Sequence, residues 1–97
     1  MKLNEVTKKQ YEIYHSTYSA AVNAAKVYAE ADGYEVSDDE WFGKINNGPR
    51  KPEEGKSNKI TLELSKDGKP SKKALHLQVY NRGNTIKNNY ELNAYIS

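Results

Sequence analysis

The chain has 97 residues, contains no cysteine and carries a net charge of +2. This length predicts a single domain over residues 1–97, and the lack of thiols excludes disulfides, thiolate metal sites and a cysteine nucleophile. Only 36% of the residues are hydrophobic and eight are tyrosines, so we expect a thin, tyrosine-rich core whose phenol hydroxyls reach the surface.

The charges are unevenly distributed along the chain. Residues 1–43 carry four lysines and eight acidic residues, a balance of −4, whereas residues 44–87 carry eleven basic and four acidic residues, a balance of +7. A concentration of Lys and Arg in one half of a chain produces a positive potential that a small net charge conceals. The charge pattern therefore indicates an anionic partner.

Membrane and export signals are missing from the sequence. No segment comes near the ~18 consecutive apolar residues that a membrane span requires, and the N-terminal residues lack the apolar region of a signal peptide. We therefore expect a soluble, cytoplasmic protein with no membrane partner.

Residues 7–32 have the period of a long amphipathic helix. Aromatic and small residues recur at spacings of three and four and so share one stripe: Tyr11, Tyr14, Tyr18, Ala21, Ala25 and Tyr28. A second stripe widens this face: Ile13, Ala20, Ala24, Val27 and Ala31. Thr7 and Gln10 resemble a capping box, and Gly33 supplies the left-handed residue that often ends a helix. We expect the alanine-rich middle of this helix to pack closely on a sheet.

A second, shorter helix is predicted over residues 38–46. It follows residues 34–36, which fit either a linker or a short edge strand. The hydroxyl of Ser37 can accept from the amide of Glu40, and the acidic residues of the first turn stabilise the positive end of the helix dipole. Trp41 should anchor this helix to the core.

The second half of the chain has the period of β-strands. Residues 48–58 contain turn formers and charges but no apolar residue other than proline, so we expect an exposed loop there. Apolar and polar residues then alternate in three segments: residues 60–65, 74–80 and 90–96. These segments predict an antiparallel meander.

The hairpin between the first two strands has two possible registers. A two-residue turn at 67–68 would place Leu64 opposite Ser71 and break the apolar face. A six-residue loop, 67–72, would place Leu64 opposite Leu75 instead. Because each buried leucine contributes roughly 1.5–3 kcal/mol, we predict the longer loop.

The same register would set Glu63 opposite His76 on the polar face of the sheet. A general acid or base can be built from such a pair, but no nucleophile motif accompanies it. We interpret it as an ordinary cross-strand contact, worth about 0.2–1 kcal/mol. His15 and His76 do not have the spacing of metal ligands, and the scattered glycines form no phosphate-binding loop. We therefore expect no enzymatic activity, no metal and no cofactor.

Basic residues gather in the predicted hairpin and in the long loop. The candidate nucleic-acid-binding residues are Arg50, Lys51, Lys66, Lys69, Lys72 and Lys73. If the two segments meet in space, they can contact a phosphate backbone while Tyr80 or Tyr95 stacks on bases. The alternative is a solvated surface that keeps the sheet edges from pairing with other chains. No motif for sequence-specific readout is present.

Three segments carry a resemblance to a known family: residues 39–44, 72–80 and 90–96. They resemble the corresponding parts of a small uncharacterised domain encoded by marine bacteriophages, and the resemblance covers most of the chain. It implies a phage origin, a location in the host cytoplasm and a non-enzymatic accessory role. It assigns no functional residues.

These observations predict an α+β fold. A long N-terminal helix and a short second helix should pack on one face of a three- or four-stranded antiparallel sheet whose other face is polar. The function that fits best is a small non-enzymatic binding module, monomeric or weakly dimeric, that contacts nucleic acid non-specifically through basic loops. The alternative is a structural or protein-interaction module, such as a virion or assembly component, that docks a protein on the exposed sheet face or an edge strand.

Overall fold

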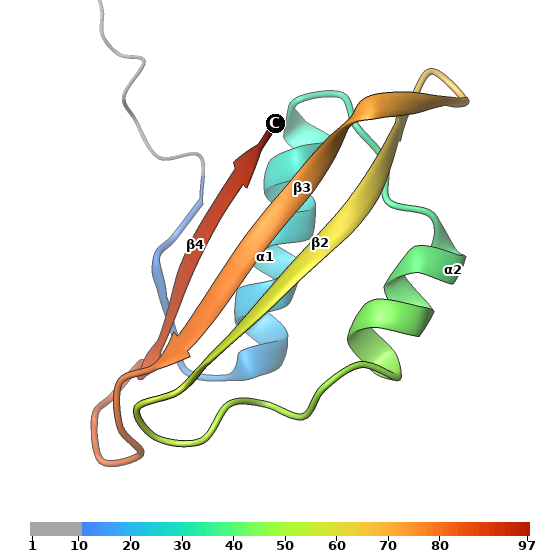
Figure 1. Ribbon diagram of the computed structural model, residues 1–97. Helices are drawn as coiled ribbons and strands as arrows, with labels where there is room; N and C mark the ends of the chain where they lie inside the picture. Colours follow the sequence, from blue (N-terminus) through green and yellow to red (C-terminus); the bar gives the residue numbers. More distant parts are fainter. Residues whose placement is uncertain (1–10) are drawn as a thin grey trace, which may run out of the picture.

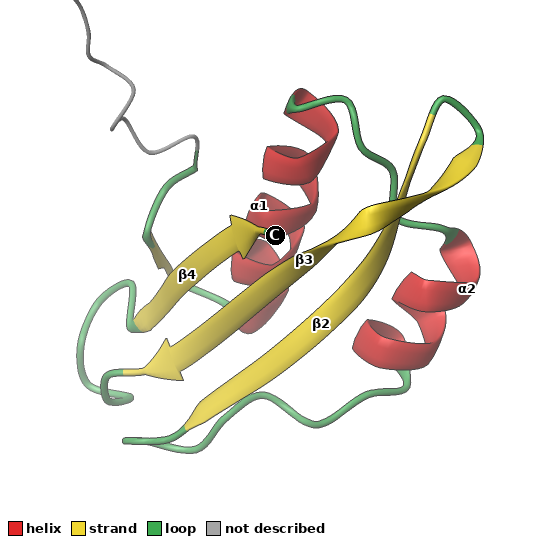
Figure 2. Cartoon of the chain, turned by 45° about the horizontal axis from the view of Figure 1, so that its top comes forward, coloured by secondary structure: helices red, strands yellow, loops and turns green. Residues whose placement is uncertain are grey.

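The computed structural model describes residues 11–97, which form a four-stranded antiparallel sheet with helices on one side (Figures 1 and 2). The strands lie in the spatial order β1 (Tyr14–His15), β4 (Tyr90–Ile96), β3 (Lys69–Asn81) and β2 (Ser57–Lys66). Strands β2, β3 and β4 form the predicted meander, and the short β1 adds to the outer edge of β4. The predicted α+β fold is confirmed.

Helix α1 (Tyr18–Ala31) begins later than the sequence predicts. Its N-cap is Thr17, whose hydroxyl accepts a hydrogen bond from the Ala20 amide at 3.0 Å. The preceding residues pair with β4 as strand β1, because they can satisfy backbone groups at that sheet edge. The predicted capping pair Thr7 and Gln10 lies outside the described residues. Gly33 follows the helix with a φ of +89°, which confirms the predicted left-handed stop.

The core lies between α1 and the inner face of the sheet. The small residues of α1 that are buried there allow a close approach: Ala21, Val22, Ala25 and Ala29. Leucine and valine side chains of all three long strands face them, and Leu62, Leu75 and Leu92 are fully buried. The predicted second stripe is wrong at Val27, which is 59% exposed because the buried face of α1 is narrower than predicted.

The second helix lies alongside the edge strand β2 (Figure 2). Helix α2 (Asp38–Trp41) continues as a π-helical turn, η2 (Phe42–Asn46), and the hydroxyl of Ser37 caps it as predicted by accepting from the Glu40 amide at 3.1 Å. Trp41 packs against the core, and Lys26 Nζ of α1 lies 4.9 Å from its ring centroid. This contact ties the two helices together.

The predicted hairpin register is wrong. Asp67 and Gly68, with φ values of +55° and +78°, form a two-residue turn, and the ladder begins directly with Lys66 opposite Lys69. The ladder then shifts near Leu64, after which Leu62 faces Leu75. An irregularity in β3 therefore restores the apolar face that a regular two-residue hairpin would break.

Side chains of α2 and η2 form hydrogen bonds with the outer edge of β2. Glu40 Oε2 accepts from the Glu63 amide at 2.6 Å, and Lys44 Nζ donates to the Thr61 carbonyl at 3.0 Å. Glu40 and Lys44 also form an ion pair at 3.3 Å. Glu35 pairs with Ser65 as an isolated bridge, which resolves residues 34–36 as a short edge contact. Exposed edge strands invite pairing with other chains, and these contacts occupy the part of the edge between Thr61 and Ser65.

Glu40→Ala is expected to destabilise the fold by about 1–2 kcal/mol, because the Glu63 amide loses a charged acceptor. Chemical denaturation measures the change. Asp39→Ala is the matched control, because it removes an acidic residue from the same helical turn without touching β2. Equal losses in both variants would show that the carboxylate of Glu40 acts only on its own helix.

Tyrosines seal the borders of the core, as predicted. The hydroxyl of Tyr11 donates to the Ala94 carbonyl at 3.2 Å and accepts from the Ala94 amide at 3.0 Å, so it takes the place of a strand residue beside β4. The ring of Tyr11 packs edge-on against Tyr28 at 5.2 Å. Burial, with smaller contributions from Tyr11 and Asp32, raises the pKa of the Tyr28 phenol.

Candidate binding surface

The face of the sheet opposite α1, here called the outer face, is not covered by a helix (Figure 1). The side chains that β3 places on it are half-buried: Ala74, His76, Gln78 and Tyr80. The neighbouring strands contribute mostly exposed side chains: Lys59, Thr61 and Glu63 from β2, and Glu91, Asn93 and Tyr95 from β4. The predicted polar face is therefore present, and it includes aromatic rings.

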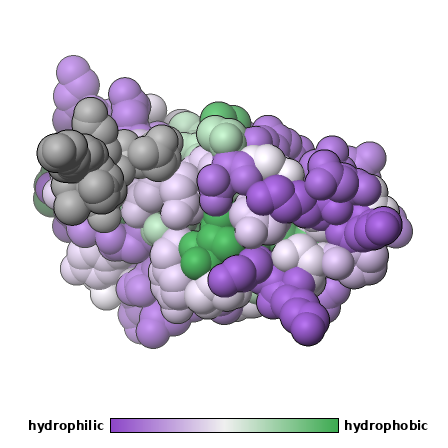
Figure 3. All heavy atoms as spheres, turned by 90° about the horizontal axis from the view of Figure 1, so that it is seen from above, coloured by the Kyte–Doolittle hydropathy of each residue, from purple (hydrophilic) through white to green (hydrophobic). Residues whose placement is uncertain are grey.

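Apolar side chains form no extended patch on the end of the molecule seen in Figure 3. Hydrophobic residues there show as small areas among hydrophilic ones. The large hydrophobic side chains that are exposed belong to separate segments: Tyr14, Val27, Phe42, Ile86 and Tyr95. Protein-docking surfaces often carry a contiguous apolar area, and this view shows none.

His76 occupies the middle of the outer face. Its Nδ1 lies 3.2 Å from Thr61 Oγ1 and its Nε2 lies 3.0 Å from Ser97 Oγ. Hydroxyl groups can both donate and accept, so these partners are compatible with either tautomer of the ring. The ring stacks on Tyr95, with centroids 4.8 Å apart and planes inclined by 23°. Four side chains thus form one cluster across the sheet.

The predicted pairing of Glu63 with His76 is wrong. Thr61 lies opposite His76, and Glu63 lies opposite Ala74, because the irregular hairpin moves β2 by two residues relative to the predicted register. The even shift keeps each side chain on its predicted face but changes its neighbours. The described partners of the His76 ring are hydroxyl groups and not carboxylates, so Glu63 does not form the acid–base pair with His76 that the sequence raised as a possibility.

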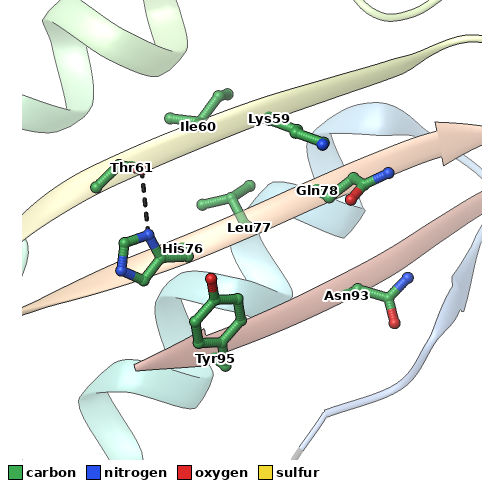
Figure 4. Close-up of a pocket in the computed structure, with 8 residues that line it drawn as sticks. All are labelled: Lys59, Ile60, Thr61, His76, Leu77, Gln78, Asn93 and Tyr95. Carbon is green, nitrogen blue, oxygen red and sulfur yellow. Dashed lines mark hydrogen bonds between the residues drawn. The ribbon is translucent and has the colours of Figure 1, made fainter. Parts of the chain in front are cut away.

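A shallow hollow of about 240 Å³ lies beside the His76–Tyr95 stack (Figure 4). Its polar lining consists of Lys59, Thr61, His76, Gln78, Asn93 and Tyr95. The core residues Ile60 and Leu77 also line it. Lys59 is the charged member of this lining. Clefts for drug-sized ligands measure about 300–1,000 Å³ and enclose their occupant, so this open hollow fits part of a larger ligand better than a small molecule.

Four of the predicted nucleic-acid-binding residues lie together on the β2–β3 hairpin. This segment, residues 66–73, is here called the lysine hairpin. Its members are Lys66, Lys69, Lys72 and Lys73, and all four are exposed. Lys66 Nζ lies 4.4 Å from the ring centroid of Tyr34. Among residues 11–97 the ion pair is between Glu40 and Lys44. No described carboxylate therefore forms an ion pair with a lysine of the lysine hairpin.

Arg50 and Lys51 lie at the opposite end of β2. The carbonyl of Arg50 accepts a hydrogen bond from Asn58 Nδ2 at 2.6 Å, which places it beside the start of the strand. Asn58 and Lys66 are about 25 Å apart along β2, at ~3.3 Å per residue. The structure therefore separates the two predicted groups, and the long basic loop does not meet the lysine hairpin.

Sequence reasoning named Tyr80 and Tyr95 on the outer face but missed the polar partners around His76. The alternation of β2 places Thr61 and Lys59 on the same face, and this signal was available. Ser97 joins the cluster because its backbone pairs with Ala74 beyond the end of β4, which only the register decides.

The described residues contain no group of three potential metal ligands. No helix within residues 11–97 is long and apolar enough to cross a membrane. The chain matches no known protein family, no curated protein and no solved structure at a significant level.

Proposed function

We propose that the protein is a small non-enzymatic binding module that holds nucleic acid through the lysine hairpin. The observation that carries the proposal is the gathering of Lys66, Lys69, Lys72 and Lys73 on one exposed arm, where no described carboxylate forms an ion pair with them. Asp67 in the turn is the one acidic residue of that arm, so its balance is +3, four lysines minus one aspartate. Arg50 and Lys51 are too distant to share its contacts.

Such an arm suits a phosphate backbone. Lysine side chains that neutralise phosphates release condensed counterions, and this gain does not depend on base sequence. A hairpin with a tight turn holds its lysines at fixed spacing, which lowers the entropy lost on binding. We therefore expect non-specific, salt-dependent affinity.

Replacing three hairpin lysines tests the proposal. The variant Lys69→Gln, Lys72→Gln, Lys73→Gln is expected to weaken binding of labelled DNA and RNA oligonucleotides by at least about tenfold near 50 mM salt. It should also flatten the slope of log affinity against log salt by about 2–3, because each lost phosphate contact contributes about 0.7–0.9. Fluorescence anisotropy over a salt series measures both quantities.

The matched control is Arg50→Gln, Lys51→Gln, Lys56→Gln, which changes the net charge by the same amount at the far end of β2. It should alter the affinity by less than about threefold and leave the salt slope unchanged. Equal losses in the two triple variants would assign the affinity to net charge, and undetectable binding of the wild-type protein at low salt would overturn the proposal.

The competing function is a structural or protein-interaction module, and a phage origin fits either function. The contacts of Glu35, Glu40 and Lys44 occupy the middle and end of the β2 edge, so an added strand could not pair along its full length. A protein partner of such a module would therefore dock on the open outer face. Recovery of a stoichiometric protein partner whose binding is lost on changing the outer face would favour this function.

A further inference from the structure

The exposed ring of Tyr95 offers a stacking surface on the outer face. Tyr95 is 58% exposed although one part of its ring packs on His76 at 4.8 Å. The Thr61 and Ser97 hydroxyls hold the imidazole from both sides at 3.2 and 3.0 Å, so the stack has a defined position. A held aromatic pair with free ring area is the feature on which proteins stack unpaired bases.

Polar side chains line the hollow beside this stack (Figure 4). Lys59 supplies a positive charge, and the Asn93 amide forms no hydrogen bond with another described side chain or backbone group. Gln78 Nε2 donates to Ser57 Oγ at 3.2 Å and keeps its carbonyl for another donor. These groups can reach the edge of a base or a phosphate, and an amide offers both donor and acceptor atoms.

The stack and the lysine hairpin lie along one strand. Lys72 precedes His76 by four residues of β3, a length of roughly 13 Å at ~3.3 Å per residue. A few nucleotides of an extended single strand are enough to span that length. One strand can therefore contact the lysine hairpin with its phosphates and the stack with a base.

We infer that the His76–Tyr95 stack and the adjoining hollow form a site for an unpaired nucleobase, and that the preferred ligand is single-stranded nucleic acid. The inference rests on the proposed function and adds a second contact to it. Bases in a duplex are stacked on one another and expose only their edges, so they cannot use this site. The charges agree with this occupant, because Lys59 and the lysine hairpin both attract phosphate.

The test compares a single strand of about 12 nucleotides with an abasic strand of equal length, which has the same phosphates but no bases. Wild-type protein should bind the base-containing strand about 5–100-fold more tightly. Tyr95→Ala should remove this preference while leaving the affinity for the abasic strand within about twofold, and Tyr95→Phe should retain the preference. Phe42→Ala is the control, because Phe42 is also 58% exposed but lies on η2.

The outcomes test separately the base contact at the His76–Tyr95 stack and the phosphate contact at the lysine hairpin. Equal binding of base-containing and abasic strands would overturn the stacking site while leaving the lysine hairpin as a phosphate contact. A preference that persists in Tyr95→Ala, or that Phe42→Ala also abolishes, would overturn the assignment to this stack. If neither strand binds at low salt, the proposed function fails as well. Circular dichroism of each variant confirms that the fold is kept.

Discussion

Leu75→Ala is expected to destabilise the protein by about 2–5 kcal/mol. Leu75 is fully buried at the centre of the sheet, where it lies opposite Leu62 on one side and Ile96 on the other. Truncation removes apolar burial and leaves a cavity. The buried residues of α1 are too small to fill this cavity. A total stability of 5–15 kcal/mol is typical of a domain, so this change should lower the midpoint of urea denaturation markedly.

Val27→Ala is the control for this substitution. Val27 lies on α1 but is 59% exposed, so its truncation should change the free energy of unfolding by less than about 0.5 kcal/mol. The sequence pattern places Leu75 on the apolar face of a strand and Val27 on an apolar stripe of a helix. Only the packing shows that Leu75 is buried and Val27 is exposed. A loss at Val27 comparable with that at Leu75 would contradict the core described above.

Asn81→Ala is expected to cost about 2–4 kcal/mol, the second largest effect. Asn81 is 1% exposed at the end of β3. Its Nδ2 donates to the Pro52 carbonyl at 3.0 Å and to Asn84 Oδ1 at 3.1 Å, while its Oδ1 accepts from the Gly83 amide at 2.9 Å and from Asn89 Nδ2 at 2.7 Å. Alanine would leave buried polar groups without partners, which is costlier than the loss of an exposed hydrogen bond.

Thermal or urea denaturation measures the effect of Asn81→Ala, and amide hydrogen exchange locates it. Exchange should accelerate first at Gly83 and in the loop around Pro52, because Asn81 joins these two segments. Asn93→Ala is the control, since Asn93 is exposed on the outer face, and it should have an effect below about 0.5 kcal/mol. A stability loss without faster exchange at Gly83 would contradict the role of Asn81 as the link.

The sequence predicted the helices and strands because their signals are local. Alternation of apolar residues identifies β2, β3 and β4, and Ser37 and Gly33 mark helix ends through contacts within a few residues. Strand β1 escaped prediction, since Tyr14 and His15 pair with Tyr90 and Glu91 far along the chain. A residue such as Tyr14, which fits a helical stripe, can still join a sheet when an unpaired edge lies nearby.

The candidate binding surface was only partly predictable for the same reason. The gathering of lysines in residues 66–73 is visible in the sequence, and a hairpin brings them together whatever its register. The cluster of Thr61, His76, Tyr95 and Ser97 depends on how three strands align, which the irregularity near Leu64 decides. Sequence periodicity determines faces, but it does not determine neighbours across strands.

The uneven distribution of charge shows which features the sequence determines and which the tertiary structure determines. The sequence by itself determined that one half is basic, that its lysines crowd a hairpin and that the sheet has a polar face. Only the tertiary structure decided that Arg50 and Lys51 lie about 25 Å from that hairpin, because the extended strand β2 separates its two ends at ~3.3 Å per residue. It also placed Tyr95 beside His76, because pairing between β3 and β4 is not encoded by a local pattern.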